Sequence, residues 1–354
     1  MKFLYNTLRW ANMLLILATL LAYLAPHANP AKIWQLSFLG LAYPFLLVGN
    51  IGFIIFWAVK RKPYFLFSIG CILVGFGYFT SFFGWHFFSG KTGGKDDIKL
   101  MTYNIAGFRK FEAESKDKQQ LKTAILEKFA QENGQPDILC IQEGSGDQAV
   151  EVIRKTFGYS HYFKKKGTVI FSKYPFVNQD MLPFGNTGNS CVWADLKTPK
   201  GIVRVYCAHL QSNWLTYTAN KIATKGDLRE KQTWKDIRYV MRQYKNAVAI
   251  RAGQAQVIKD HLSKSPYPVI LCGDFNDPPV SYVHRLLSEG LQDSFCEKGS
   301  GVSFTFAGKL PALRIDYVLC SKIFQVKSHR VGDVELSDHF PVLVSLELEA
   351  RGGR

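Results

Sequence analysis

The chain has 354 residues, of which 47% are apolar and 20% are charged, and its formal net charge is +16. Such a composition excludes a disordered or fibrous protein, and the length is enough for about two domains. The excess of Lys and Arg favours anionic partners such as nucleic acid or phospholipid headgroups, although a solvated basic surface without a specific ligand explains it as well.

The N-terminal quarter of the chain contains three long apolar segments. No Asp, Glu, Lys or Arg occurs within residues 10–31, 33–59 or 63–90, and a helix of about 20 apolar residues can cross a bilayer. We therefore expect residues 1–88 to be a membrane anchor with three transmembrane helices. A signal peptide is the alternative for the first segment, but two more segments follow it and no convincing cleavage site precedes Pro30.

Basic residues in the short loops predict the orientation of this anchor. Lys2 and Arg9 precede the first segment and Lys60–Lys62 connects the second to the third, whereas the loop between the first two contains only Lys32. Short loops rich in Lys and Arg remain in the cytoplasm. Two lysines after the third segment weaken this bias without reversing it. We therefore expect an integral membrane protein, of the inner membrane in a bacterium, whose remaining domain lies on the non-cytoplasmic side.

A flexible linker at residues 89–97 separates the anchor from a water-soluble domain at residues 98–349, and residues 350–354 form a tail. In this domain, apolar runs typical of strands alternate with segments of helical period. Strands are expected near residues 98–104, 137–142, 159–163, 168–171, 191–196, 203–209, 269–273, 314–320 and 342–348, and helices near residues 118–131, 148–156, 219–262 and 281–287. This pattern predicts an α/β fold in which two mixed β-sheets pack face to face between helices.

Polar side chains recur at or near the ends of the predicted strands. A single Asp or Asn there is usually a turn residue or a helix cap, and a lone His beside apolar residues is usually structural. Eight such residues on six strands are harder to explain in this way, because strand ends are where a rigid scaffold presents reactive groups. They are Asn104, Glu143, His209, Asp274, Asn276, Asp316, Asp338 and His339. Together they predict a single site.

Six short motifs carry these residues and resemble, in the same order, the motif series of the endonuclease/exonuclease/phosphatase superfamily. The motifs are Thr102–Asn104, Ile141–Glu143, Ala208–Ser212, Gly273–Asn276, Arg314–Tyr317 and Ser337–Pro341. The resemblance covers about residues 98–348 and leaves out the apolar segments. It implies the deoxyribonuclease I-like four-layer α/β/β/α sandwich, and hydrolysis of a phosphoester by in-line attack of water, assisted by Mg²⁺ or Mn²⁺.

The resemblance also implies which residues bind the metal ion. Hard divalent cations prefer oxygen ligands, commonly one or two carboxylates together with water and substrate phosphate. Glu143 is accordingly expected to be the principal ligand, and Asn104 and Asp338 are expected to complete the shell directly or through water.

The remaining five residues are expected to act on the water and on the phosphate. Asp274 would orient or deprotonate the attacking water, and Asn276 would hold that water and a phosphate oxygen. His339, paired with Asp316, would donate to the phosphate, and His209 would donate to a non-bridging or leaving oxygen. Which group is the general base and which is the general acid stays open at this point.

The leading functional hypothesis is a membrane-anchored endo- or exonuclease, because the soluble domain is basic. A phospholipid or sphingomyelin-type phosphodiesterase, or a phosphatase of small phosphoesters such as inositol phosphates, is the alternative, because residues 10–88 would hold the domain near the lipid bilayer. A catalytically silent binding module is a remote third hypothesis, since all eight positions are intact. A transporter or channel is disfavoured because the apolar segments offer no path for an ion.

A few other polar residues allow more than one interpretation. Basic residues recur with Trp234 and Tyr239 along the long helical stretch, where they could face nucleic acid, anionic lipid or only solvent. Asn189 precedes a central strand and could lie near the site. Arg251 and Gln254 are expected to be structural.

Overall fold

The computed structural model of the protein describes most of the chain. The described residues are 2–86, 94, 96–107, 126–127, 129–131, 134–144, 146–213, 229–307, 313–332 and 337–349. Most of the predicted linker, most of the predicted helix at 118–131, the first part of the predicted helix at 219–262 and the tail lie outside these residues.

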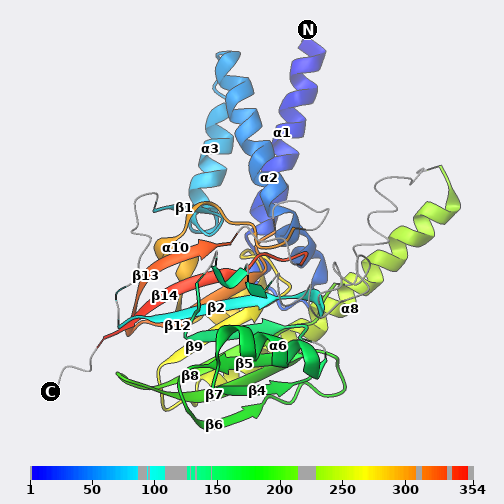
Figure 1. Ribbon diagram of the computed structural model, residues 1–354. Helices are drawn as coiled ribbons and strands as arrows, with labels where there is room; N and C mark the ends of the chain where they lie inside the picture. Colours follow the sequence, from blue (N-terminus) through cyan, green and yellow to red (C-terminus); the bar gives the residue numbers. More distant parts are fainter. Residues whose placement is uncertain are drawn as a thin grey trace.

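Two six-stranded mixed β-sheets form the centre of the domain (Figure 1). The first sheet has the order β13 (Phe324–Val331), β14 (Val342–Leu348), β2 (Ile98–Asn104), β3 (Ile138–Gln142), β5 (Thr168–Ser172) and β4 (His161–Lys165). The second has the order β10 (Leu291–Asp293), β12 (Asp316–Ser321), β9 (Val269–Asp274), β8 (Gly201–His209), β7 (Ser190–Thr198) and β6 (Phe176–Met181). In each sheet one central pair is parallel, β2 with β3 and β8 with β9.

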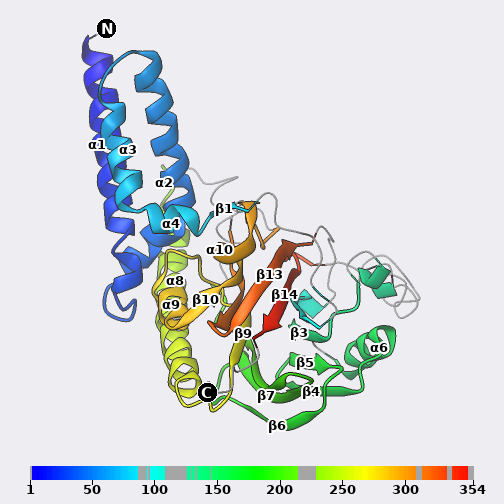
Figure 2. The same cartoon turned by 90° about the vertical axis from the view of Figure 1, so that its left-hand side faces the viewer.

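The two sheets pack face to face on a core of Val, Ile, Leu and Cys side chains that alternate along the central strands. Helices α8 (Lys231–Leu262) and α9 (Tyr282–Ser288) cover the outer face of the second sheet, and α6 (Asp147–Phe157) lies outside the first (Figure 2). A short helix, α10 (Ser294–Lys298), follows β10. The predicted four-layer α/β/β/α sandwich is therefore confirmed, and its layers are those expected for sheets that bury one face on each other and the other on helices.

The N-terminal region contains two helices long and apolar enough to cross a membrane, not the three that we predicted. They span Phe3–His27 and Trp34–Val59 and correspond to α1 (Lys2–Ala22) with η1 (Ala25–His27), and to α2 (Trp34–Val59). The third predicted span is divided into α3 (Phe65–Val74) and α4 (Phe76–Thr80), followed by β1 (Phe83–Trp85). The helix is interrupted at Gly75, where the backbone lies so close to the ring of Tyr23 that a Cβ atom would overlap it.

The apolar helices are packed directly on the sandwich domain. Val280 belongs to the same buried cluster as Tyr43, and a Cβ atom at Gly40 would overlap the carbonyl oxygen of Val280. Arg285 on α9 donates from Nε to the carbonyl oxygen of Pro26 at 2.6 Å. Strand β1 also pairs with β11 (Ser300–Val302) to form a small antiparallel sheet. These contacts hold the helices at one end of the sandwich, with the N-terminus at the far end of the helical bundle (Figure 1).

Candidate active site

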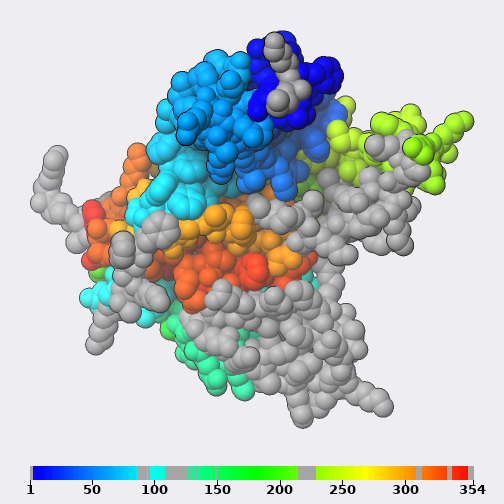
Figure 3. Space-filling view, turned by 90° about the horizontal axis from the view of Figure 1, so that it is seen from above, coloured from blue at the N-terminus to red at the C-terminus, as the bar shows by residue number. Residues whose placement is uncertain are grey.

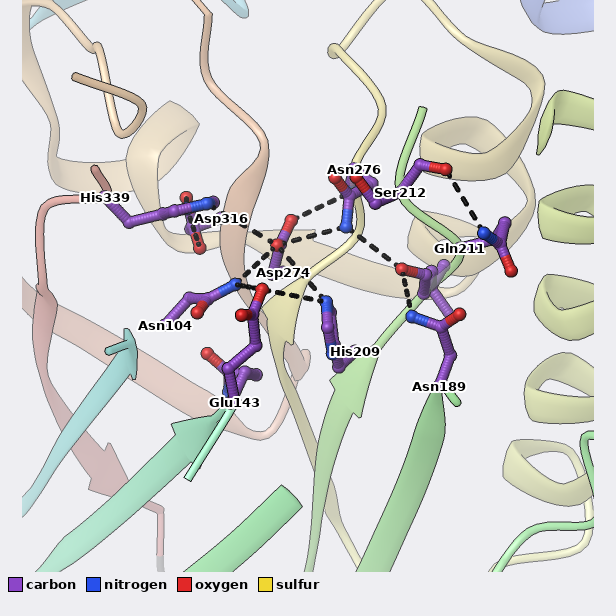
Figure 4. Close-up of polar contacts among 12 residues, drawn as sticks. Asn104, Glu143, Asn189, His209, Gln211, Ser212, Asp274, Asn276, Asp316 and His339 are labelled. Atoms are coloured by element: carbon purple, nitrogen blue, oxygen red, sulfur yellow. Dashed lines mark hydrogen bonds and ion pairs between the residues drawn. The ribbon is translucent and has the colours of Figure 1, made fainter. Parts of the chain in front are cut away.

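Strand register places Asp274 at the centre of a polar site (Figure 4). This residue ends β9, and its neighbours in the second sheet are His209 at the end of β8 and Asp316 at the start of β12. Because β8 runs parallel to β9 and β12 runs antiparallel to it, one strand must end and the other must begin at the same edge. Three of the predicted residues are thus adjacent through backbone pairing alone.

The first sheet contributes the opposite wall of the site. Parallel strands β2 and β3 end side by side, which brings Asn104 next to the residue after β3, Glu143. The Nδ2 atom of Asn104 lies 3.3 Å from Glu143 Oε1 and 3.0 Å from Asp274 Oδ2. Asn104 is therefore the hydrogen-bonded link between the carboxylates of the two sheets.

Unusual backbone conformations aim two of the side chains. Glu143 and Asn276 both have a φ of 54°, in the left-handed region that residues other than glycine seldom adopt. Gly273 has a φ of 131°, and a Cβ atom there would overlap the carbonyl oxygen of Ala208, so only glycine fits before Asp274. Such conformations cost about 1–3 kcal/mol each and are concentrated at functional sites.

Asp274 is almost completely buried and accepts several hydrogen bonds. The backbone nitrogen of Asn276 donates to Oδ1 at 2.8 Å, and the amide of the same residue donates to Oδ2 at 3.1 Å. Burial raises the pKa of Asp274; the nearby charge of Asp316 adds to this effect, whereas His339 and His209 oppose it. A carboxylate with a raised pKa is a stronger proton acceptor than a solvated one, which suits a group beside an attacking water.

His339 and Asp316 form a buried pair next to Asp274. The ring atom Nδ1 donates to Asp316 Oδ2 at 2.9 Å, and this leaves Nε2 on the side of Asp274, 3.8 Å from its Oδ2. Burial alone would lower the pKa of His339, but the carboxylates of Asp316 and Asp274 raise it to about 10. The ring is therefore an imidazolium at neutral pH, able to donate a charge-assisted hydrogen bond.

His209 has a ring nitrogen available for a substrate. Its Nε2 atom is 3.8 Å from Glu143 Oε1 and 3.9 Å from Asp274 Oδ2. The atom is buried, and it has no hydrogen-bond partner among the residues that the structure describes. Buried polar atoms of this kind call for an explanation, and a phosphate oxygen between the two carboxylates would supply the missing partner.

Asp338 is placed differently from the other predicted residues. Its carboxylate accepts from the hydroxyl of Ser337 at 3.3 Å, and its carbonyl oxygen accepts from the backbone of Ala307. Its charge contributes to the raised pKa of His339. The structure thus connects seven of the eight residues through a continuous series of contacts, whereas Asp338 lies beside His339 at the edge of the group.

The oxygen-rich composition of the site suits a hard divalent cation. Ligand atoms of Asp274, Asp316 and His339 lie within 4.8 Å of one another, close enough to hold an ion. His339, however, is cationic and its Nδ1 is bonded to Asp316, so it is a poor metal ligand. Glu143 offers a carboxylate at the more open side, where it keeps 32% of its side chain exposed. Asn104 is buried, its amide oxygen accepts from the backbone of Ala106, and its Nδ2 donates to Glu143, so it orients that carboxylate. Glu143 therefore fits Mg²⁺ or Mn²⁺ better.

Asn276 of the predicted set and several residues outside that set hold the loop after His209 in place. Asn189 and Asn276 both donate to the carbonyl oxygen of Leu210, at 2.9 and 3.0 Å. On α8, Gln254 accepts from the backbone of Gln211 at 2.8 Å. The sequence indicated only that Asn189 could lie near the site, because an Asn before a strand is ordinarily a turn residue.

Arg251 on α8 makes the most extensive of these supporting contacts. Its Nη1 atom donates to the carbonyl oxygen of Gln211 at 2.6 Å and to Asn213 Oδ1 at 3.0 Å. Its Nη2 atom forms an ion pair with Asp277 at 2.9 Å. The guanidinium therefore joins the loop after His209 to the loop after Asp274, which is the structural role expected from the sequence.

A metal-dependent phosphoesterase is the class of enzyme that this fold and these side chains define. The chain belongs to the Endonuclease/Exonuclease/phosphatase family, whose family model matches residues 101–339. A second match, to a domain of unknown function (DUF8431), covers residues 5–82. No curated protein matches the chain.

Solved structures similar to the chain have the same fold. The endonuclease/exonuclease/phosphatase from Bacteroides vulgatus is 18% identical, with a TM-score of 0.50 over 72% of this chain and 100% of its own. TDP2 of D. rerio, humanised by 14 mutations, is 15% identical, with a TM-score of 0.50 over 72% of this chain and 100% of its own. At these identities the likeness shows the fold alone.

Proposed function

We propose that the chain is a membrane-anchored, divalent-metal-dependent phosphodiester hydrolase that cleaves by in-line attack of water. The observation that carries this proposal is the convergence of Asn104, Glu143, His209, Asp274 and the His339–Asp316 pair at one edge of the sandwich. Family membership accounts for a phosphoesterase in general. The membrane anchor, the diester substrate and the individual roles of the residues are the further steps proposed here.

The side chains divide the reaction between two sides of the phosphate. Asp274, held by both donors of Asn276, would accept a proton from the attacking water and orient it. The imidazolium of His339 and the unpartnered Nε2 of His209 would donate to phosphate oxygens as negative charge develops. Glu143, with Asn104 and Asp338 through water, would hold Mg²⁺ or Mn²⁺, which neutralises phosphate charge when bound. The Nε2 atoms of His209 and His339 lie 3.9 and 3.8 Å from Asp274 Oδ2, which supports a role for both rings at one phosphate.

The substrate is proposed to be a nucleic acid or a phospholipid headgroup. The basic character of the chain supports a nuclease, endo- or exonucleolytic. A specific observation favours the second candidate: the loop that continues from Asp274 through Asp277 to Val280 is packed on the apolar helices. An anchor attached to the catalytic loop itself would keep the site close to the bilayer.

Anchoring and orientation are supported by the position of the apolar helices. We propose that residues 10–88 contact the lipid bilayer and that the catalytic domain lies on the non-cytoplasmic side. The N-terminus and the basic loop Lys60–Lys62 lie at the end of the helical bundle away from the sheets (Figure 1). Basic loops are retained in the cytoplasm, so this arrangement agrees with an exported domain.

The test uses the full-length chain in detergent micelles or nanodiscs, because the anchor is packed on the domain. Linear and circular DNA, RNA, sphingomyelin and phosphoinositides are offered with Mg²⁺ and with Mn²⁺, before and after treatment with EDTA. We expect turnover of one of these substrates to stop with EDTA and to return with either metal. Turnover that persists in EDTA would contradict the proposed metal dependence.

Two substitutions test the assignment of residues. Glu143→Gln and His339→Gln keep the size of each side chain and should each lower kcat about 100-fold or more, since positioned acid–base and electrostatic groups contribute factors of this size. The control is Glu289→Gln, which neutralises an exposed carboxylate in a surface ion pair with Lys259. Near-normal activity in both site variants, with an intact fold, would reject the assignment.

A further inference from the structure

A series of apolar side chains leads from the end of the apolar helices to His339. Strand β1 follows α4 and pairs with β11, with Phe83 directly opposite Val302. Residues opposite each other in an antiparallel pair present their side chains on the same face. Trp85 shares this face because strand side chains alternate with a period of two, and its ring centroid lies 4.8 Å from that of Phe83. The ring of Phe79 on α4 is 6.0 Å from both rings, so the face is continuous with the apolar helices.

The chain after β11 keeps this alternation of outward and inward side chains. Val302 and Phe304 are 52% and 39% exposed, whereas Ser303 and Thr305 are buried. The hydroxyl of Thr305 accepts from the backbone nitrogen of Asp316 at 3.0 Å. The inward residues thus support the site, and the outward residues form an apolar surface.

Phe306 brings this surface to the site itself. Its ring centroid is 5.1 Å from that of His339, with an interplanar angle of 72°. The backbone nitrogen of Ala307 donates to the carbonyl oxygen of Asp338 at 2.7 Å, which fixes the segment beside that histidine. We give the name apolar stripe to five residues: Phe83, Trp85, Val302, Phe304 and Phe306.

The apolar stripe lies on the side of the domain that carries the apolar helices. Figure 3 views the molecule from the helix end, and the orange segment around residue 300 is visible there beside the light-blue end of the apolar region. No Asp, Glu, Lys or Arg occurs within residues 76–86 or 300–307. An exposed Trp next to an apolar helix is typical of a membrane interface. A nucleic acid is the less suitable partner, because its backbone requires cations along the surface that it follows.

We infer that the apolar stripe lies in the surface of the bilayer and leads a phospholipid to the site, so that the bond cleaved is a phosphoester bond of a membrane lipid. The inference rests on the proposed function and names the substrate class. The acyl chains would stay in the bilayer beside Val302 and Phe304 while the phosphate reaches Nε2 of His339. Water then adds to phosphorus, one P–O ester bond breaks, and the leaving oxygen takes up a proton.

Contact with the bilayer is tested on the full-length chain in phosphatidylcholine nanodiscs that contain a lipid with a nitroxide near the top of its acyl chain. A fluorophore is attached to Phe304→Cys in a Cys296→Ser background, because Cys296 is the exposed cysteine and the other six are buried. The matched control is Tyr162→Cys on β4, which is 46% exposed at the end of the sandwich away from the helices (Figure 1). A nitroxide quenches only at short range, so we expect strong quenching at position 304 and little at position 162. Equal quenching at the two positions would overturn the inference.

Use of the apolar stripe by the substrate is tested with two kinds of diester. The lipids are phosphatidylcholine, phosphatidylglycerol, phosphatidylinositol and sphingomyelin in nanodiscs, and the soluble diester is bis(p-nitrophenyl) phosphate. The variant Val302→Ser/Phe304→Ser should lower the ratio of kcat/KM on the lipid to kcat/KM on the soluble diester about 10-fold or more. Full burial of one such side chain corresponds to a factor of about 10 to 100, and these two are already partly buried. The control Val177→Ser/Tyr162→Ser alters two side chains of similar exposure at the far end of the sandwich and should keep the ratio of the parent.

The outcomes separate this inference from the proposed function. Hydrolysis of the soluble diester without hydrolysis of any lipid would overturn the inference and leave the proposed hydrolase in place. Hydrolysis of neither, with Mg²⁺ or with Mn²⁺, would reject both. An unchanged ratio in Val302→Ser/Phe304→Ser would also overturn the inference. Cleavage of DNA that falls in this variant, without cleavage of lipid, would overturn it too and would assign the apolar stripe to stacked bases.

Discussion

Replacement of Arg251 by Met should destabilise the protein and disturb catalysis, although this residue does not contact the reacting groups. Its side chain is fully buried between the loop after His209 and the loop after Asp274. Removal of the guanidinium deprives Gln211 and Asn213 of a donor and leaves the buried carboxyl of Asp277 without its cation. Burial already raises the pKa of Asp277, and Arg251 opposes that rise, so the unpaired carboxyl becomes protonated more readily in the variant.

The size of the effect follows from the burial of the pair. Removal of one partner of a buried ion pair costs about 3–5 kcal/mol of unfolding free energy, which for a domain of this size is a fall in Tm of roughly 6 to 20 °C. The double variant Arg251→Met/Asp277→Asn leaves no charge unpaired. It should recover about 1–3 kcal/mol relative to the sum of the single variants.

The measurement is thermal unfolding of the full-length chain in detergent, together with kcat on the member of the proposed substrate panel that the parent enzyme turns over. The control is Arg238→Met, which removes an exposed guanidinium from the same helix and should change the unfolding free energy by less than about 0.5 kcal/mol. An unchanged Tm in Arg251→Met would refute the reasoning. So would strict additivity of the two substitutions, because the loops would then not be joined through this pair.

Two further predictions concern topology and pH. A reporter that is active only after export should be active when fused after Arg354 and inactive when fused after Lys62, and the reverse result would overturn the proposed orientation. Burial lowers the pKa of His329 to about 4, so the unfolded chain binds the proton more tightly. Stability should therefore fall by up to about 3 kcal/mol between pH 6.5 and pH 4. The unfolding free energy, measured by denaturation at several pH values in this range, should change less with pH in His329→Gln. An equal dependence on pH in the parent and the variant would reject the account.

The sequence predicted the central strands and most of the site because both depend on local patterns. Each central strand is an apolar run, and the polar residue that follows it marks the edge of the sheet. Strands β6, β10 and β13 were not predicted. They lie at the edges of the two sheets, where one neighbour is missing and polar side chains interrupt the alternation, so periodicity is a weak signal there.

Contacts between distant parts of the chain explain what the sequence did not show. Hydropathy revealed the third apolar segment, but it could not show that the helix is interrupted at Gly75, against the ring of Tyr23 some fifty residues earlier. The sequence motif includes Asp338, yet its orientation beside Ser337 depends on a turn bonded to Ala307. The partners of Arg251 lie in two loops that only the fold brings together, so its type and position in a helix could not reveal them.

The close contact of Gly40 with the carbonyl oxygen of Val280 limits how this enzyme can be divided. A chain shortened to its hydrolase half would expose Val280 and lose the partner of Arg285, six and eleven residues beyond Asp274 respectively. Assays on a domain purified without the apolar helices would thus be made on an enzyme whose loop after Asp274 has lost its packing partners. The same reasoning applies to engineering: a transplant of this hydrolase to another host protein should carry the first 86 residues with it, and a foreign tether would not replace them.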